Sequence, residues 1–117
     1  MTASRLLSAA LLLAAFSSSA AAEDCVAAFD SAQSDYRRAQ SAQDALEATR
    51  GGKLDGTLCQ GRLDLLDLRF ELADRYEVCA RDGGTFPADT ADAMDREAGM
   101  LASQKSDWIK VCGPLMK

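Results

Sequence analysis

The sequence predicts an all-α protein, in which an up-down-up three-helix bundle is stapled by two disulfides and preceded by a cleaved signal peptide. Glycine and proline residues cluster at three places after residue 22 and divide the rest of the chain into long segments. Within each segment apolar residues recur at helical spacing, and strict alternation of apolar and polar residues is nowhere sustained. Four cysteines lie close to the expected helix ends, which allows disulfides to join neighbouring helices. We therefore expect three helices and no sheet.

The N-terminal 22 residues have the three-part pattern of a secretory signal peptide. One arginine precedes an apolar run over residues 6–16, and small residues follow as far as Ala22. Two acidic residues come next, so we expect cleavage after Ala22. Residues 1–22 are then the signal peptide, and residues 23–117 form one disulfide-stapled three-helix domain that is periplasmic or secreted.

The first helix is expected from Cys25 to Arg50. Asp24 can cap its N-terminus, and Gly51 can adopt the left-handed conformation that ends many helices. One apolar seam advances along this helix by alternating steps of four and three residues, through Cys25, Phe29, Ala32, Tyr36, Ala39, Gln43 and Leu46. A single seam indicates a single partner helix.

The second helix is expected from Leu58 to Ala80, opened by a capping box between Thr57 and Gln60 and followed by Gly83. Its apolar residues fall on two neighbouring faces. One face holds Leu58, Leu65, Leu68, Leu72 and Cys79, and the other holds Cys59, Leu63, Leu66, Phe70 and Ala73. A helix with two apolar faces has a partner on each side, so we place it between the other two helices.

The third helix is expected from Ala88 to Cys112, between a preceding proline and a following glycine-proline pair. Its seam again alternates three- and four-residue steps, through Ala91, Met94, Ala98, Leu101, Lys105, Trp108 and Cys112. Two glycines interrupt the predicted helices, Gly61 in the second and Gly99 in the third. Each costs about 1 kcal/mol relative to alanine, which does not outweigh the apolar pattern.

Helix geometry selects one of the three disulfide pairings that four cysteines allow. Cys59 and Cys79 lie at opposite ends of the second helix, about 30 Å apart at 1.5 Å per residue, which is too far for a disulfide. A link between Cys25 and Cys59 would likewise have to bring opposite ends of the first helix together. In an up-down-up bundle Cys25 lies level with Cys79, and Cys59 lies level with Cys112. We therefore predict the disulfides Cys25–Cys79 and Cys59–Cys112. A redox or zinc site is not indicated, because no two cysteines have the short spacing that such sites use.

Two polar residues interrupt the apolar seams, Gln43 in the first helix and Lys105 in the third. Each lies two turns from the same end of the bundle, and Asp67 on the second helix lies near that height, so we expect these three side chains to form a polar layer. Such a layer fixes the register of a bundle, or it forms a pocket for a small ligand. Trp108 is the only tryptophan. We expect it to shield the nearby disulfide, with a role as a binding aromatic as the alternative.

The composition excludes several kinds of chemistry. The chain has no histidine, so a His-containing catalytic triad, an imidazole base and a His metal ligand are excluded. Asp89, Asp92 and Asp95 lie in the first turns of the third helix, where the helix dipole favours acidic side chains without any catalytic role. The formal charge of −5 disfavours nucleic-acid binding. We expect no catalysis, no cofactor and no metal, and no transmembrane segment in the mature chain.

These observations predict a small exported, non-catalytic protein that binds another macromolecule or serves as an accessory of the cell envelope. A first alternative is a carrier of a small apolar ligand in the bundle core, because alanines occur along both outer seams at positions 32, 39, 91 and 98. A second alternative is an inhibitor of a secreted hydrolase. The partner is expected to be a protein or another component of the envelope.

Overall fold

The computed structural model describes the backbone of residues 3–117 and the side chains of residues 20–117. In that part of the chain every regular element is helical: α1 (Ala3–Thr49), α2 (Gly56–Arg81), α3 (Ala88–Cys112) and the short 3-10 helix η1 (Gly113–Met116). The all-α class and the three long helices are confirmed, and α3 has the predicted bounds.

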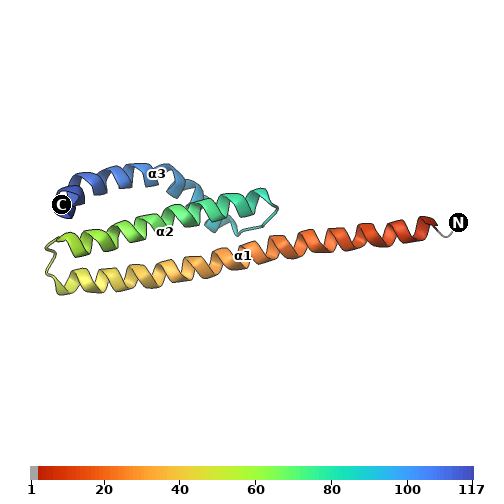
Figure 1. Ribbon diagram of the computed structural model, residues 1–117, viewed down its shortest axis with the longest axis horizontal. Helices are drawn as coiled ribbons and strands as arrows, with labels where there is room; N and C mark the ends of the chain where they lie inside the picture. The colour runs from red at the N-terminus through yellow and green to blue at the C-terminus, as the bar shows by residue number, and fades with distance from the viewer. Residues whose placement is uncertain (1–2) are drawn as a thin grey trace.

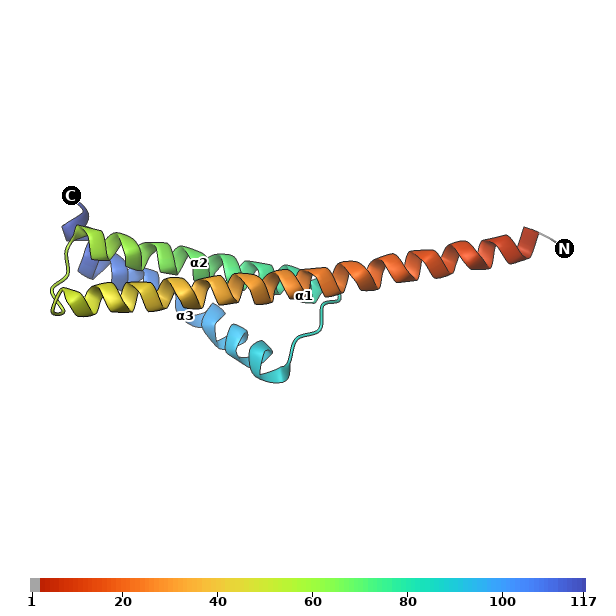
Figure 2. The ribbon, with the colours of Figure 1, turned by 90° about the horizontal axis from the view of Figure 1, so that it is seen from below.

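The three long helices are arranged with α2 in the middle (Figure 1). α1 and α2 form a long antiparallel hairpin, and α3 returns along another side of α2. α2 packs against both α1 and α3, whereas the described parts of α1 and α3 have no close backbone contact. Seen from below, the N-terminal half of α3 diverges from α2 (Figure 2). The two apolar faces predicted for the second helix therefore serve two different partners.

Both disulfides are formed as predicted. Cys25 is bonded to Cys79, with Cα atoms 5.7 Å apart, and Cys59 is bonded to Cys112, with Cα atoms 5.5 Å apart. The first bond joins α1 to the end of α2, and the second joins the start of α2 to the end of α3. Gly84 packs directly on the first disulfide, because a Cβ atom at this residue would lie 2.4 Å from Cys79 Sγ.

A cluster of apolar side chains joins all three helices at the end of the hairpin that carries the first disulfide. Phe29 of α1, Leu72 of α2 and Met94 of α3 form its centre and are 0%, 5% and 4% exposed. The rings of Tyr76 and Phe86 pack around Phe29, with centroids 6.1 Å and 5.1 Å from the centroid of its ring. Since Phe86 belongs to the loop before α3, the cluster attaches this loop, and α3 at Met94, to the hairpin.

The first helix begins earlier than predicted. α1 begins at Ala3, so Asp24 lies inside the helix and does not cap it. The three alanines before the acidic pair have the highest helix propensity of any residue, and neither glycine nor proline stands before Asp24 to end a helix. At the other end Gly51 has a φ of 62°, as expected for the left-handed residue after a helix. The signal peptide at residues 1–22 and its cleavage stay predictions.

The second helix is capped by a different residue from the one predicted. α2 begins one residue after Asp55, whose carboxylate accepts a hydrogen bond from the backbone N–H of Leu58 at 2.8 Å. Thr57, the predicted cap, lies inside the helix. Aspartate is a stronger N-cap than threonine, and Asp55 also pairs with Arg50 across the turn between α1 and α2.

Gly61, which lowers the helix propensity of α2, makes room for a buried side chain of α1. Gln43 is 8% exposed, and its Nε2 donates a hydrogen bond to the carbonyl oxygen of Leu58 at 3.0 Å. A Cβ atom on Gly61 would lie 2.0 Å from Gln43 Oε1, so the glutamine would have to leave its place. Gly99, the other glycine inside a helix, has nothing within 4 Å of the corresponding position. The two glycines therefore form a matched pair, one crowded and one open.

Gly61→Ala is expected to lower the free energy of unfolding by up to about 2 kcal/mol. The displaced Gln43 amide loses a buried hydrogen bond, at a cost of about 1–3 kcal/mol, and this offsets or exceeds the gain in helix propensity of about 1 kcal/mol. Gly99→Ala is the control and is expected to raise the free energy of unfolding by about 1 kcal/mol. Urea unfolding followed by circular dichroism measures both differences.

A double-mutant cycle isolates the steric cause of the Gly61 effect. When Gln43 is replaced with alanine, Gly61→Ala should become stabilising, which corresponds to a coupling energy of about 1–3 kcal/mol between the two positions. An unchanged effect of Gly61→Ala in the Gln43→Ala background would contradict the explanation.

Candidate functional site

The three residues of the predicted polar layer lie in different surroundings. Gln43 is buried between α1 and α2, where it is bonded to the backbone of Leu58. Asp67 and Lys105 are exposed, and no ion pair joins them in the part of the chain whose side chains are described. Lys105 instead lies over the ring of Phe70, with Nζ 5.6 Å from the ring centroid. These three side chains therefore do not form one layer.

A different polar cluster lies between the helices. Arg69 of α2 donates from Nε to Glu97 Oε1 on α3 at 2.5 Å and from Nη1 to Gln104 Oε1. Gln104 lies two helical turns beyond Glu97 along α3. The side chains of Arg69 and Glu97 are 19% and 22% exposed, so salt screens this pair less than an exposed one. Tyr36 of α1 lies close by: burial raises the pKa of its hydroxyl, and the positive charge of Arg69 opposes part of the rise. The contacts of Arg69 with Glu97 and Gln104 thus join α2 to α3.

The apolar residues of α3 make this cluster hard to recognise in the sequence. From Met94 the predicted seam advances four residues to Ala98, whereas the half-buried residue is Glu97, three residues on. The same shift occurs one heptad later, where Gln104 is half-buried and Lys105 is exposed. A helical seam can advance by three or by four residues. Because alanine is apolar, the sequence favours the four-residue step to Ala98, whereas the structure has the three-residue step to Glu97. The signal that identifies the cluster is the seven-residue spacing of two long polar side chains beside an apolar seam.

Trp108 is half-buried close to the Cys59–Cys112 disulfide. Its indole N–H donates to the carbonyl oxygen of Cys59 at 2.9 Å, which ties the end of α3 to the start of α2. The ring also lines a depression of about 280 Å³ together with Arg62 and Leu66 of α2. Trp108 therefore contributes to the joint between the helices and keeps part of its ring accessible.

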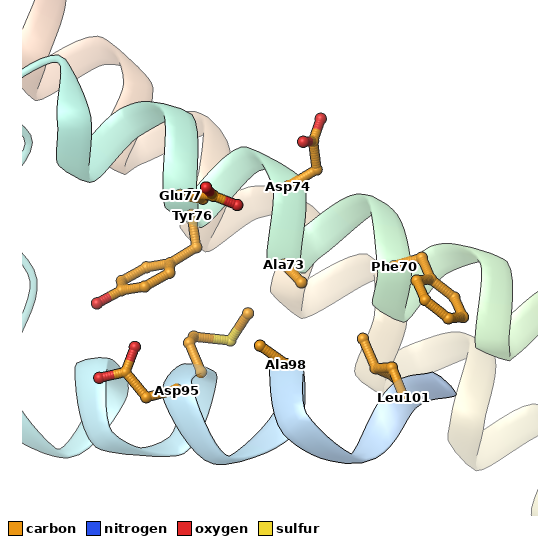
Figure 3. A pocket seen from close by; sticks show the side chains of 9 residues that line it. Phe70, Ala73, Asp74, Tyr76, Glu77, Asp95, Ala98 and Leu101 are labelled. Carbon is orange, nitrogen blue, oxygen red and sulfur yellow. The ribbon is translucent and has the colours of Figure 1, made fainter. Parts of the chain in front are cut away.

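An open groove of about 420 Å³ lies between α2 and the part of α3 that diverges from it (Figure 3). Its apolar lining consists of Phe70, Ala73, Tyr76, Met94, Ala98 and Leu101. Phe70 is 36% exposed and lies at one end, and Tyr76 points from α2 toward α3 at the other (Figure 3). Ala73 and Ala98 approach each other in the middle (Figure 3). Because each carries only a methyl group, the centre of the groove stays open.

Three carboxylates line the same groove, those of Asp74 and Glu77 on α2 and that of Asp95 on α3. Asp95 points toward α2, whereas Asp74 points away from α3 at the outer edge (Figure 3). Among the described side chains Asp74 and Asp95 have no ion-pair partner, and Glu77 has one contact of 4.0 Å, with Arg81. Lys105 lies at the Phe70 end of the groove, with its Nζ over the ring of Phe70. The groove is therefore apolar inside and mostly negative along its rim.

No family model, curated protein or solved structure matches the chain. The geometry of the described residues is therefore the basis for a functional assignment. Within residues 20–117, no three Cys, Asp or Glu side chains are grouped so that they could hold a metal ion. No helix in the described part of the chain is both long enough and apolar enough to cross a membrane.

The alanines that suggested a ligand cavity in the bundle core lie on different sides of α2. Ala32 lines a depression of about 160 Å³ between α1 and α2, whereas Ala98 lines the α2–α3 groove. Of the three aspartates at the start of α3, only Asp95 lines that groove. What the groove offers chemically is apolar contact surface together with carboxylate oxygens.

Proposed function

We propose that this is a small exported, non-catalytic helical protein that binds another macromolecule through the groove between α2 and α3. The observation that carries the proposal is an open groove with an apolar lining, in which Phe70 is 36% exposed while Met94 and Leu101 form a buried floor. A contiguous apolar surface bordered by polar side chains is typical of interaction sites. A partner that covers it removes apolar area from water, which stabilises the complex by about 25 cal/mol per Å².

Fixed contacts between α2 and α3 support this role. The Arg69–Glu97 ion pair and the Cys59–Cys112 disulfide join α2 to α3, and Met94 attaches α3 to the hairpin. A surface that is already ordered loses little conformational entropy on binding. The groove is thus preorganised for binding.

The shape of the groove favours a macromolecule over a small ligand. Small-molecule sites are concave and enclose most of the surface of the ligand. This groove lies open along the outside of two helices, and its rim carries charged side chains (Figure 3). A carrier of a small apolar ligand would leave much of that ligand in contact with water.

Export to the periplasm or the medium is part of the proposal. Two disulfides support it, because such bonds persist in oxidising compartments. The predicted signal peptide at residues 1–22 points to the same route. The partner is then a protein or another component of the envelope or of the surroundings of the cell.

Site-specific photo-crosslinking tests the proposal. A photoreactive phenylalanine analogue replaces Phe70 and, in a matched control, Ile109, which is 55% exposed on α3 and lies outside the groove. After irradiation of the fraction that contains the exported protein, we expect one discrete adduct from position 70 and none from position 109. Excess wild-type protein should suppress the adduct, and Phe70→Ala protein should need about a three- to tenfold larger excess for the same suppression. No adduct from position 70, or the same adducts from both positions, would refute the proposal.

A further inference from the structure

We infer that the partner of the α2–α3 groove is a cationic amphipathic helix, an inference that rests on the proposed role of the groove as a docking surface. A helix bound in a groove inserts apolar side chains at positions i, i+3 or i+4, and i+7, and keeps its polar face in water. The dimensions of the groove and its charge both favour such a partner.

The groove has the length of two helical turns. From Phe70 to Glu77 it follows α2 for seven residues, about 10 Å at 1.5 Å per residue. Two turns of a docked helix present three apolar side chains on one face. Ala73 and Ala98 approach each other in the middle of the groove (Figure 3), and their small side chains allow a third helix backbone to come close to α2 and α3.

The charge of the groove favours a cationic partner. Asp74 and Asp95 have no ion-pair partner among the described side chains, and Glu77 has only its long contact with Arg81. Complementary charge steers a partner to its site and fixes its register. A second copy of this chain would bring a formal charge of −5 to the same rim, which disfavours self-association there. Lysine or arginine residues beside an apolar stripe complement both the rim and the interior.

Lys105 partly covers the end of the groove that the partner would occupy. Its Nζ lies 5.6 Å from the centroid of the Phe70 ring, and a cation–π contact at an exposed site is worth only about 0.5–1 kcal/mol. A cationic helix must displace this ammonium group, which also repels the charges of the helix. Removing the side chain should therefore strengthen binding.

The probe is a synthetic helix of about 18 residues, or five turns, with leucines on one face and lysines on the other. One control peptide has glutamate in place of every lysine. A second control has the same leucines and lysines in an order without helical periodicity. Isothermal titration calorimetry at several salt concentrations measures binding. We expect the cationic amphipathic helix to bind at least about tenfold more tightly than either control, with an affinity that falls as salt rises.

Variants of the protein locate the binding site. Phe70→Ala and Asp95→Asn are each expected to weaken peptide binding about three- to tenfold, and Lys105→Ala is expected to strengthen it. Ile109→Ala and Asp44→Asn are the matched controls, because both residues are exposed and lie outside the groove. They should leave the affinity unchanged. Circular dichroism establishes that each variant keeps its helical structure.

Three results would overturn the inference: equal binding of the glutamate peptide, equal binding of the peptide without periodicity, or equal effects of groove and control variants. The photo-crosslinking experiment separates this failure from that of the proposed function. A specific adduct from position 70 without binding of the cationic helix would refute the cationic partner and keep the docking surface. The absence of both would refute both.

Discussion

Replacing Cys59 and Cys112 together with alanine is expected to lower the free energy of unfolding by about 4 kcal/mol. The bond joins residues 53 positions apart, and without it the unfolded chain gains the entropy that this loop had lost. Domains of this size have a total stability of about 5–15 kcal/mol, so the loss is a large fraction of the whole. Urea unfolding of the oxidised wild type and the variant measures the difference.

The loss of stability should be concentrated in α3. The described part of α1 has no close backbone contact with α3, so α3 depends on α2 for most of its attachment. Close to its C-terminal end this attachment includes the disulfide and the hydrogen bond from Trp108 to Cys59. Amide hydrogen exchange should therefore show a marked loss of protection in α3, while the hairpin of α1 and α2 stays protected.

The matched variant replaces Cys25 and Cys79 with alanine. These residues are 54 positions apart, so the chain-entropy contribution is almost the same, about 4 kcal/mol. The bond joins α1 to α2, and its loss should loosen the hairpin near Phe29 while the C-terminal half of α3 stays protected. Protection lost equally in α3 for both variants would contradict the roles assigned to the two bonds.

The disulfide pairing was predictable because it depends only on helix lengths and on the direction of the chain. Both follow from glycine, proline and apolar spacing. The bounds of α3 were predictable for the same reason, since Pro87 and Gly113 flank it directly. Before Asp24 no such residue interrupts the chain, so the start of α1 was misplaced.

The side chains between the helices were harder to predict. Steps of three and four residues are both compatible with a helix, so the sequence does not decide whether Glu97 or Ala98 faces inward. The rotation of α3 about its own axis decides which of the two faces inward. That rotation depends on the Arg69–Glu97 ion pair and on the Cys59–Cys112 disulfide at the C-terminal end of α3. The groove follows from the same rotation, because it brings Ala98 and Lys105 to the surface beside Phe70. In the sequence only the seven-residue spacing of Glu97 and Gln104 points to the inward face of α3.

Phe29→Ala is the second change with a large expected effect, about 3–5 kcal/mol of destabilisation. Phe29 is 0% exposed and packs with Leu72 of α2, Met94 of α3 and Phe86 of the connecting loop. Removing the ring leaves a cavity among three helices and a loop, which no shift of a single helix can close. Urea unfolding measures the loss, and hydrogen exchange should show that the loop and the start of α3 become less protected.

Phe70→Ala is the matched control, because it makes the same chemical change at a residue that is 36% exposed. Its expected cost is about 1–2 kcal/mol, since part of this ring already contacts water. Comparable losses at both positions would contradict the placement of Phe29 in the core and Phe70 on an open surface. The pair also separates stability from binding. Phe29→Ala should weaken binding of the cationic helix only as far as it unfolds the protein, whereas Phe70→Ala should weaken binding while all three helices stay folded.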